Sequence, residues 1–356
     1  ICRELARELG YDVFVISPAK KFSRESETNI GFARIYIELW PKPFATLSYI
    51  VKSFAECFKL KQRIEIIHAH TAFYPMVAGF VFSIITHKPY IVACQGSDIR
   101  ISSRKFLYRT IQTPFLYKAK KIVVVSNEMS EVLRQKYGIP KRKILVVGTG
   151  YDNRTIDELG NIELPAESDR VMRIINVANM RPVKDHITLL KGFKRLTESM
   201  KGVRLLLVGD GPLRGQLEEF CTQQSLHDVE FLGKLPHEEA LKQIANSDAL
   251  ILTSIEEGMP TVVIEALALG KPVIATAVGG IPEVVKAGVN GILVPPKSPE
   301  HIAKTLERLL TDSDLRRKLS MAAAESVKDY TWTKIAEKYE RIYSILVRGR
   351  PISERA

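Results

Sequence analysis

The chain has 356 residues, 46% of them hydrophobic and 26% charged, which is enough for two domains with cores of ordinary size. Its formal net charge is +12, and the excess is confined to residues 1–150, which hold 24 Lys and Arg against 11 Asp and Glu. No apolar run reaches the ~18 residues of a transmembrane helix, so hydropathy predicts no membrane-spanning segment. The charge asymmetry predicts either a polyanionic partner for the first half or a solvated basic face.

The opening, ICRELARELGYDVFVIS, is interrupted by acidic residues and lacks the apolar stretch of a signal peptide. It has the pattern of a helix surface, so we expect a strand and a loop to precede it. Cys2, Cys57, Cys94 and Cys221 lie in apolar contexts without CxxC spacing. They predict buried thiols in a reducing compartment rather than disulfides.

Short apolar, β-branched runs alternate with helical patterns through the first half. The expected strands are 13–17, 64–70, 90–94, 121–126 and 143–148, and the expected helices are 44–62, 73–86, 103–118 and 127–137. Runs without polar alternation are typical of strands buried on both faces. They therefore predict a parallel sheet.

The polar stretch 149–170 predicts an inter-domain linker, after which the alternation restarts. The second set of expected strands is MRIINVAN, VRLLLVGD, VEFLG, DALILTS, KPVIAT and GILVPP. We predict an α/β protein of two doubly wound, Rossmann-like domains, residues 1–155 and 165–329, followed by an amphipathic helix at 330–348 that packs back toward the first domain. Such domains face each other across a cleft, and ligands bind at the carboxyl ends of the strands.

The stretch SIEEGMPTVVIEALALGKPV, residues 254–273, places two carboxylates eight positions apart in apolar surroundings. Pro260 suits the first turn of a helix, and the free amides of residues 261–263 at that helix start predict a phosphate site. Glu257 precedes the site, and Glu265 lies roughly 7–8 Å along the axis at ~1.5 Å per residue. A nucleotide-sugar, with a diphosphate between two hydroxyl-rich ends, matches this spacing. The alternative is that Glu257 caps the helix and Glu265 is solvated.

The sequence also resembles a known family over almost its whole length. EGMPTVVIEALALGKPVIAT is similar to the E-x7-E motif of the retaining, GT-B-fold glycosyltransferases, family four (glycosyl transferases group 1). Eight further segments follow the family's order: IEIIHAH with CQGSDI, VVVSNEMSEVL, ILVVGTGYD, VANMRPVKD, LLLVGDGPLR, VEFLGKLP, VGGIPEVV and YTWTKIAEKYERIY. The resemblance implies transfer of a sugar with retention of configuration and without a metal or other cofactor.

The resemblance also implies roles for individual residues. Glu257 would bind the donor sugar, Glu265 the ribose hydroxyls, and Lys184 the leaving diphosphate, for which a flexible ammonium is suited. The rest of the implied donor site is Gly209, Gly211, Pro212, Leu235, Gly258, Met259, Pro260, Thr261 and Val262. The implied acceptor and sugar side is His70, Gln95 and Asp98.

Three features depart from the family pattern. The family usually has an arginine five residues before its lysine, whereas this chain has Asn179 there and Arg181 as the nearest substitute. Gln95 replaces the family's histidine in the segment CQGSDI. The glycine-rich loop that follows the family's first strand is absent from the sequence.

Other readings of the same motifs remain open. Gly209, Gly211 and Gly215 follow a strand, as in an oxidoreductase, but no acidic residue ends the next strand to hold a ribose. His68 and His70 suggest a metal site, but a third ligand has no obvious source, which favours strand-end histidines that face the cleft or the core. Asp312, Ser313 and Asp314 match the DxD of metal-dependent transferases, yet they fall between two helices, where Asp and Ser are ordinary caps.

Two functions of other classes also fit. Gln95 and Asn179 favour a catalytically silent protein that binds nucleotide-sugars, and the architecture suits a nucleotide-sugar epimerase. The basic first half favours docking on an anionic membrane surface, on the cytoplasmic side, where a lipid-linked acceptor would lie. Its basic clusters are Lys20 and Lys21, Arg104 and Lys105, 118–121 and 141–143. Nucleic acid is the rival polyanion, although no recognised nucleic-acid module is present.

Overall fold

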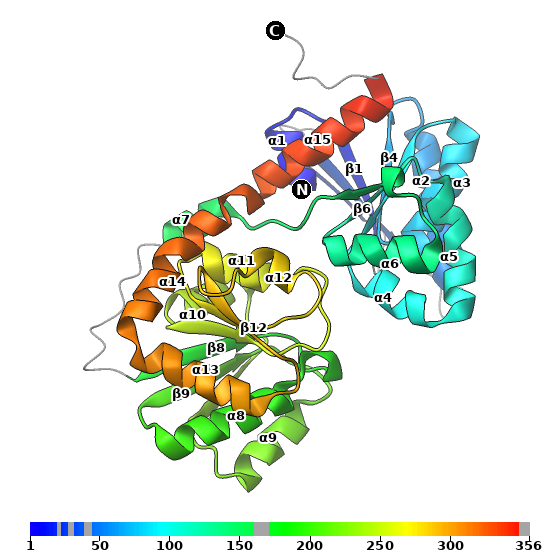
Figure 1. The fold of residues 1–356 in the computed structure, drawn as a ribbon. Helices are drawn as coiled ribbons and strands as arrows, with labels where there is room; N and C mark the ends of the chain where they lie inside the picture. Colours follow the sequence, from blue (N-terminus) through cyan, green and yellow to red (C-terminus); the bar gives the residue numbers. More distant parts are fainter. Residues whose placement is uncertain (20–22, 28–31, 39–44, 160–170, 349–356) are drawn as a thin grey trace. The chain divides into compact units, whose positions relative to one another are not determined.

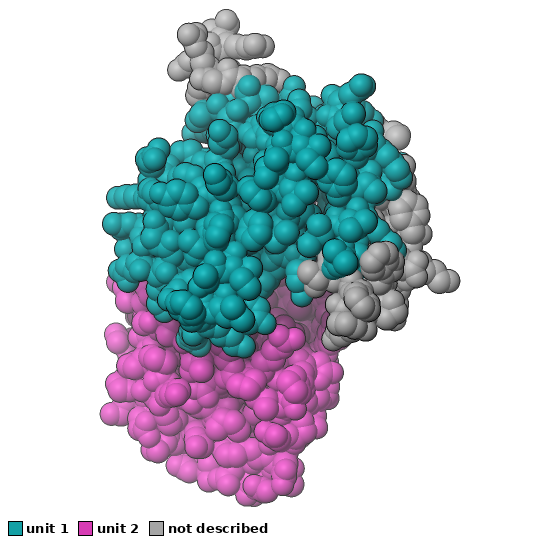
Figure 2. All heavy atoms as spheres, turned by 90° about the vertical axis from the view of Figure 1, so that its right-hand side faces the viewer, with its two compact units in different colours: residues 1–148, 332–356 teal, residues 149–331 magenta. Residues whose placement is uncertain are grey.

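A computed structural model describes residues 1–19, 23–27, 32–38, 45–159 and 171–348 (Figure 1). The chain divides into two compact units, coloured separately in Figure 2. Unit 1 comprises Ile1–Gly148 and Trp332–Ala356, and unit 2 comprises Thr149–Thr331. In the described residues, no helix is both long enough and apolar enough to cross a membrane.

Unit 1 is built on two sheets. Its helices are α1 (Cys2–Arg7), α2 (Ala45–Lys59), α3 (Tyr74–Thr86), α4 (Ser97–Arg104), α5 (Phe106–Lys118), α6 (Asn127–Tyr137), the 3-10 turn η2 (Lys141–Lys143) and α15 (Trp332–Arg348). Strands β4 (Ile67–His70), β5 (Tyr90–Cys94), β6 (Lys121–Val124) and β7 (Ile144–Val146) form a parallel sheet in that order. The expected parallel sheet is therefore confirmed for these four strands.

A second sheet of unit 1 was not predicted. Strand β1 (Val13–Ala19) pairs in parallel with β3 (Phe32–Glu38), which pairs antiparallel with β2 (Ser23–Glu27). The sequence analysis placed residues 13–17 in one series with the other strands. Its apolar-run criterion missed β2, because SRESE consists only of polar residues and its strand conformation comes from pairing with a neighbour.

The carboxy-terminal helix α15 packs inside unit 1. Its residues Ile335, Tyr339 and Tyr343 share one apolar cluster with Ile91 of β5 and Val123 of β6. Apolar side chains at intervals of four suit one helix face. Helix α15 therefore completes the hydrophobic core of unit 1, although it is far along the chain from β5 and β6.

Unit 2 is a six-stranded, fully parallel sheet with helices on both faces (Figure 1). The strand order is β10 (Val229–Gly233), β9 (Val203–Val208), β8 (Met172–Val177), β11 (Ala249–Leu252), β12 (Val273–Thr276) and β13 (Gly291–Val294). Its helices are α7 (Asn153–Leu159), η4 (Pro182–Lys184), α8 (His186–Ser199), α9 (Arg214–Gln223), α10 (His237–Ala245), α11 (Thr261–Ala268), α12 (Ile281–Val284), α13 (Pro299–Thr311), α14 (Ser313–Ser326) and η5 (Lys328–Tyr330). All six predicted strands are present.

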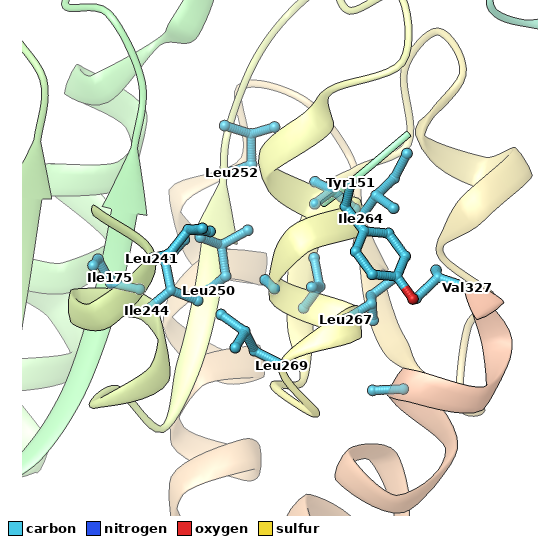
Figure 3. Packing of buried hydrophobic residues seen from close by; sticks show 14 of the residues in the cluster. Tyr151, Ile175, Leu241, Ile244, Leu250, Leu252, Ile264, Leu267, Leu269 and Val327 are labelled. Carbon is cyan, nitrogen blue, oxygen red and sulfur yellow. The ribbon is translucent and has the colours of Figure 1, made fainter. Parts of the chain in front are cut away.

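Each face of this sheet has its own core. Leu250 and Leu252 of β11 point to one cluster, which includes Ile264 and Leu267 of α11 (Figure 3). Ala249 and Ile251 belong to the cluster on the other face. Alternation along a strand buried on both sides produces this division. The strands are thereby fixed, and the loops at their carboxyl ends are held on a rigid base.

The segment predicted as a linker begins with ordered structure. Tyr151 pairs with Thr331 in an isolated β-bridge, and Ile156 of α7 is buried in the unit 2 core with Tyr151. These apolar residues are few, so periodicity did not reveal the helix. Residues 160–170 lie outside the described part of the chain.

Candidate functional site

The candidate donor site lies where three neighbouring strands of unit 2 end. Strands β9, β8 and β11 are adjacent and parallel, so the loops after them meet at one edge of the sheet. These loops carry Asn179 to Lys184, Gly209 to Pro212 and Thr253 to Pro260. The fold therefore collects residues from three separate stretches of sequence.

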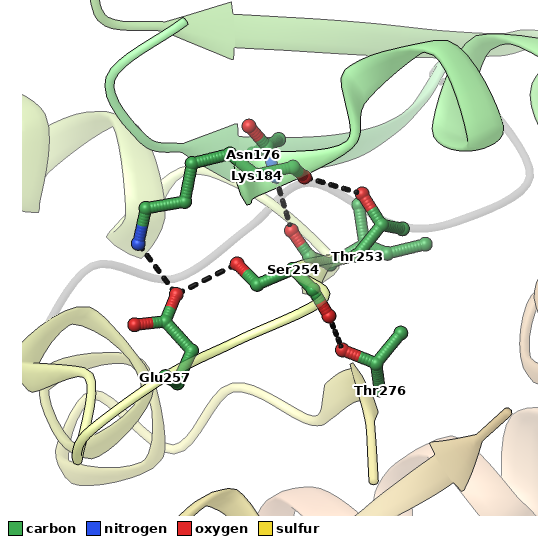
Figure 4. A network of polar contacts seen from close by, with 7 residues as sticks. Asn176, Lys184, Thr253, Ser254, Glu257 and Thr276 are labelled. Atoms are coloured by element: carbon green, nitrogen blue, oxygen red, sulfur yellow. Dashed lines mark hydrogen bonds and ion pairs between the residues drawn. The ribbon is translucent and has the colours of Figure 1, made fainter. Parts of the chain in front are cut away.

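Glu257 and Lys184 are in direct contact at this edge. The Lys184 Nζ donates to Glu257 Oε1 at 2.5 Å, and the Ser254 Oγ donates to the same oxygen at 2.6 Å (Figure 4). The side chains are 22% and 10% exposed for lysine and glutamate, respectively. A cation and an acceptor of hydroxyl hydrogen bonds thus stand side by side, although 73 positions separate them in the sequence.

The loop that carries Glu257 is held by hydrogen bonds at several points. The Thr253 Oγ1 donates to the carbonyls of Lys184 and Asp185 at 3.2 Å each, and the Ile255 amide donates to the Val183 carbonyl at 2.9 Å. The Gly280 amide donates to the Gly258 carbonyl at 2.8 Å. The Thr253 and Ile255 bonds fix the loop after β11 against the loop after β8, and the Gly280 bond ties it to the turn before α12. Together they preorganise the ion pair.

His186 lies next to this lysine, fully enclosed by protein. His186 is 1% exposed. In the described part of the chain, neither nitrogen of its ring has a hydrogen-bond partner. Burial, with a smaller contribution from the charge of Lys184, lowers the pKa of His186 to about 4. The imidazole is therefore neutral at pH 7 and adds no positive charge beside Lys184.

Gly209 and Gly211 serve the protein's own backbone. A Cβ at Gly209, where φ is +134°, would lie 2.1 Å from the Ala178 carbonyl oxygen, and one at Gly211 would lie 2.6 Å from the Met180 oxygen. The glycines thus let the loop after β9 pack on the loop after β8. The resemblance implied that these glycines make room for the nucleotide. The structure shows that they also make room for the carbonyls of Ala178 and Met180. Pro212 follows them in the same loop.

Helix α11 begins directly after the Gly258, Met259 and Pro260 turn. Pro260 is the N-cap rather than a first-turn residue, and no side chain caps the helix. Because the first amides of a helix lack internal acceptors, those of Thr261 and Val262 are available to an anion. The Val263 amide, which the sequence analysis also expected to be free, instead donates to the Pro260 carbonyl at 3.1 Å. Met259, Val262 and Leu235 are half-buried against the core, so their side chains anchor the loops.

Glu265 is buried rather than solvated. Its side chain is 10% exposed and its Oε1 lies 2.8 Å from Nε2 of His237, at the start of α10. The hydrogen bond to Glu265 raises the pKa of His237, and the Coulomb attraction of that carboxylate acts in the same direction. The sequence analysis missed His237. Its place two residues after Leu235, at a helix start, was the available signal.

In unit 1, the carboxylate of Asp98 is committed to backbone amides. It accepts from the N–H groups of Ala72 (2.9 Å), Gln95 (3.1 Å), Gly96 (2.9 Å) and Ile99 (3.1 Å). The residue is 2% exposed. Asp98 therefore orders the loop after β5 and is not itself free to bind a ligand.

The other two residues of the implied acceptor side lie close together. The Gln95 Nε2 is 3.4 Å from His70 Nδ1, and both side chains are exposed. His70 stacks on His68 with ring centroids 4.4 Å apart, and His68 Nδ1 meets the Tyr343 hydroxyl of α15 at 2.7 Å. Burial lowers the pKa of His68 well below its usual value. The surrounding protein also lowers the pKa of His70 by partly desolvating the imidazole, although one edge of the ring is open to solvent. The strand end at His70 thus carries neutral hydrogen-bonding groups.

The remaining candidates are placed as follows. Asn179 and Arg181 are exposed. Asp312 is the N-cap of α14 and accepts from the Leu315 amide at 2.8 Å, which confirms the cap interpretation of the DxD match. In the described residues no cluster of three or more His, Cys, Asp or Glu could hold a metal.

Two family descriptions match the chain, one in each half. Residues 165–326 match "Glycosyl transferases group 1", and residues 1–154 match "Glycosyltransferase Family 4". A curated relative, the N-acetyl-alpha-D-glucosaminyl L-malate synthase of Bacillus anthracis, is 27% identical, with 97% of this chain and 93% of the relative covered.

Solved structures share the fold. Sucrose-phosphate synthase from Thermosynechococcus elongatus has a TM-score of 0.80 at 19% identity, with 98% of this chain and 92% of that chain covered. Anabaena HepE, in complex with UDP-glucose, has a TM-score of 0.73 at 20% identity, with 87% and 86% covered. At such identities the likeness concerns the fold, which is the two-domain GT-B arrangement of glycosyltransferases.

Proposed function

Because the chain belongs to the family-four, GT-B-fold glycosyltransferases, we propose that it transfers a sugar from a nucleotide-diphosphate sugar with retention of configuration and without a metal. The observation that carries the proposal is the contact of Lys184 with Glu257 at the edge of the unit 2 sheet. An ammonium suits the charge that develops on a leaving diphosphate. A carboxylate suits the hydroxyls of the sugar.

Four groups of unit 2 place the donor, and Arg181 assists one of them. Glu257 accepts from the sugar hydroxyls, and the free amides at the start of α11 meet the phosphates. The buried carboxylate of Glu265 accepts from the ribose hydroxyls, in place of His237 or with it. Lys184 neutralises the diphosphate, and exposed Arg181 is near enough in sequence to assist. HepE, of the same fold, was solved with UDP-glucose, which supports a nucleotide-sugar donor.

The acceptor is a glycan or a lipid-linked glycan, in the synthesis of cell-surface polysaccharide or glycolipid. His70 and Gln95 contact it from unit 1, and Asp98 orders the segments that follow β4 and β5 by accepting from the Ala72 and Gln95 amides. We place the protein at the cytoplasmic face of the membrane, bound peripherally through its basic first half. The charge of residues 1–150 supports this placement.

A silent nucleotide-sugar-binding protein is the second candidate, favoured by Gln95 and Asn179 in place of the family's usual residues. One experiment separates the two. UDP-, GDP- and ADP-sugars are screened by thermal shift, and each stabilising donor is then incubated with acceptors and without them. Product with an acceptor supports the transferase. Stabilisation without product supports the silent binder, and isomerised donor without acceptor indicates an epimerase.

A further inference from the structure

The outer face of helix α5 is apolar, although it faces solvent. Phe106 is 73% exposed, Leu107 67%, Ile111 55%, and Tyr108 and Tyr117 each 50%. The inner face is normally packed, with Leu116 buried and Phe115 in an edge-to-face contact with Phe80. A surface helix ordinarily presents polar side chains outward. A contiguous exposed apolar face therefore indicates a surface that is covered in use.

The same helix lies in a stretch of one charge sign. Residues 99–127 contain seven Lys or Arg and no Asp or Glu. The cations lie over the exposed rings: Lys105 Nζ is 5.4 Å from the Tyr108 centroid, and Arg109 Cζ is 5.6 Å from that of Phe106. Positive charge and apolar surface thus share one side of the helix.

A basic pocket lies at the carboxy-terminal end of α5. It has a volume of about 550 Å³, and its cationic lining is Lys118, Lys120, Lys121, Arg142 and Lys143. Lys143 Nζ donates to the carbonyls of Tyr117 and, at 3.0 Å, Ala119, and so caps the helix. No acidic residue lines the pocket. Five cations gathered without a counter-charge favour an anion between them.

We propose that α5 and this basic pocket form the surface by which the protein docks on an anionic bilayer, with the side chains of Phe106, Leu107 and Ile111 inserted and the pocket holding lipid phosphates. The proposal names the surface for the membrane association put forward under the proposed function, and rests on it. An anionic bilayer offers apolar and negatively charged regions together.

Two other occupants fit less well. A second copy docked through α5 by a two-fold axis would bring its own cations against these, because isologous contacts pair a surface with itself. Nucleic acid would meet the charge and stack on the rings, yet it offers nothing to the aliphatic side chains of Leu107 and Ile111. Both occupants become outcomes of the test.

The first measurement is co-sedimentation of the full chain with vesicles of phosphatidylcholine, alone or with increasing phosphatidylglycerol. We expect binding that increases with the anionic fraction and weakens strongly by about 1 M salt, where the Debye length is ~3 Å. Binding that ignores lipid charge overturns the proposal. So does a dimer that Leu107→Ser dissociates, or nucleic-acid binding weakened by the same substitutions in the absence of vesicle binding.

Matched variants assign the surface. Lys118→Ser with Lys120→Ser should lower the vesicle partition coefficient roughly tenfold or more, whereas Lys304→Ser with Lys318→Ser removes the same charge from exposed positions of unit 2 and should change it little. Leu107→Ser should weaken binding severalfold. Its control is Met321→Ser, at a unit 2 position 77% exposed. Equal effects of the test and control variants overturn the assignment.

Insertion is measured directly with Phe106→Trp and quenching by brominated acyl chains. Quenching above that of Met321→Trp supports insertion, and equal quenching contradicts it. Binding of nucleotide diphosphate in solution is followed in every variant. If that binding persists while vesicle binding is absent, the docking proposal fails alone. If vesicles bind and no nucleotide does, the proposed transferase fails instead.

Discussion

The loops after β5 and β11 use a carboxylate in opposite ways. In unit 1, Asp98 accepts hydrogen bonds from four backbone amides and is 2% exposed. In unit 2, Glu257 is held by two side chains, Lys184 and Ser254. Backbone amides cannot leave without unfolding the loop, whereas an ammonium and a hydroxyl can rotate away. A carboxylate with side-chain partners can therefore exchange them for a ligand, and one with backbone partners is structural.

The sharpest test compares stability with activity. Asp98→Ala should lower the free energy of unfolding by about 3 kcal/mol or more, because it removes the acceptor of the buried Ala72 and Gly96 amides and of the partly buried Gln95 amide. Glu257→Ala should lower it by about 1 kcal/mol or less, because the freed Lys184 side chain can extend into water, yet abolish most turnover. Chemical denaturation and a transfer assay measure both. Similar losses of stability would break the comparison.

The next effect is on rate. Lys184→Ala should lower the catalytic rate roughly a hundredfold, as the loss of one preorganised electrostatic group does. Arg181→Ala is the control, since its side chain is exposed nearby and should reduce the rate much less. Steady-state kinetics, with a donor identified by thermal shift, measures the catalytic rate of both variants. A near-normal Lys184→Ala beside an inactive Arg181→Ala would reverse the two roles.

The two glutamates should differ in what they bind. Glu265→Ala should weaken the affinity for nucleotide diphosphate by about tenfold or more, because a hydrogen bond to a charged group is lost. Glu257→Ala should not weaken that affinity, and releases Lys184 for the diphosphate, while it lowers turnover. Isothermal titration with UDP, GDP and ADP provides the measurement. Equal loss of nucleotide affinity in both variants contradicts the assignment of Glu257 to the sugar end and Glu265 to the ribose end of the donor.

The smallest expected effect is on the pH dependence of stability. Glu265 raises the pKa of His237 above its usual 6.5, so protonation favours the folded state. The stabilisation is complete below pH ~6.5 and is lost as the pH rises through the raised pKa. It amounts to less than about 1 kcal/mol, because His237 is 64% exposed. The difference in melting temperature between the parent and His237→Gln should shrink from pH 5.5 to 8.5; a constant difference excludes this linkage.

Much of the fold could be predicted because its strands are continuous apolar runs. The strand at DALILTS and the helix at TVVIEALAL were visible as local patterns, and both are present. Pairing of β2 with β3 was not visible, since a polar strand depends on its neighbour. The same holds for α7, whose few buried residues, such as Ile156, pack on elements far along the chain.

The candidate site divides along the same line. Spacing singled out Glu257 and Glu265, because acids are unusual in such an apolar stretch. Spacing could not show that Lys184 and His237 would be their partners, since each contact joins residues from separate elements. Nor could the glycine pattern show that Gly209 makes room for the Ala178 carbonyl, because that approach depends on how two loops pack.

In the absence of a ligand, Lys184 and Glu257 bind each other. A ligand that binds either side chain must therefore replace this contact. A free diphosphate that draws the lysine away leaves the carboxylate without a cation, and a free sugar offers hydroxyls but no anion for the lysine. Only an intact nucleotide-sugar replaces both halves of the pair at once. In the proposed reaction, the ion pair therefore makes the site bind the intact nucleotide-sugar in preference to the free sugar or the free nucleotide diphosphate. The ion pair re-forms when the products leave.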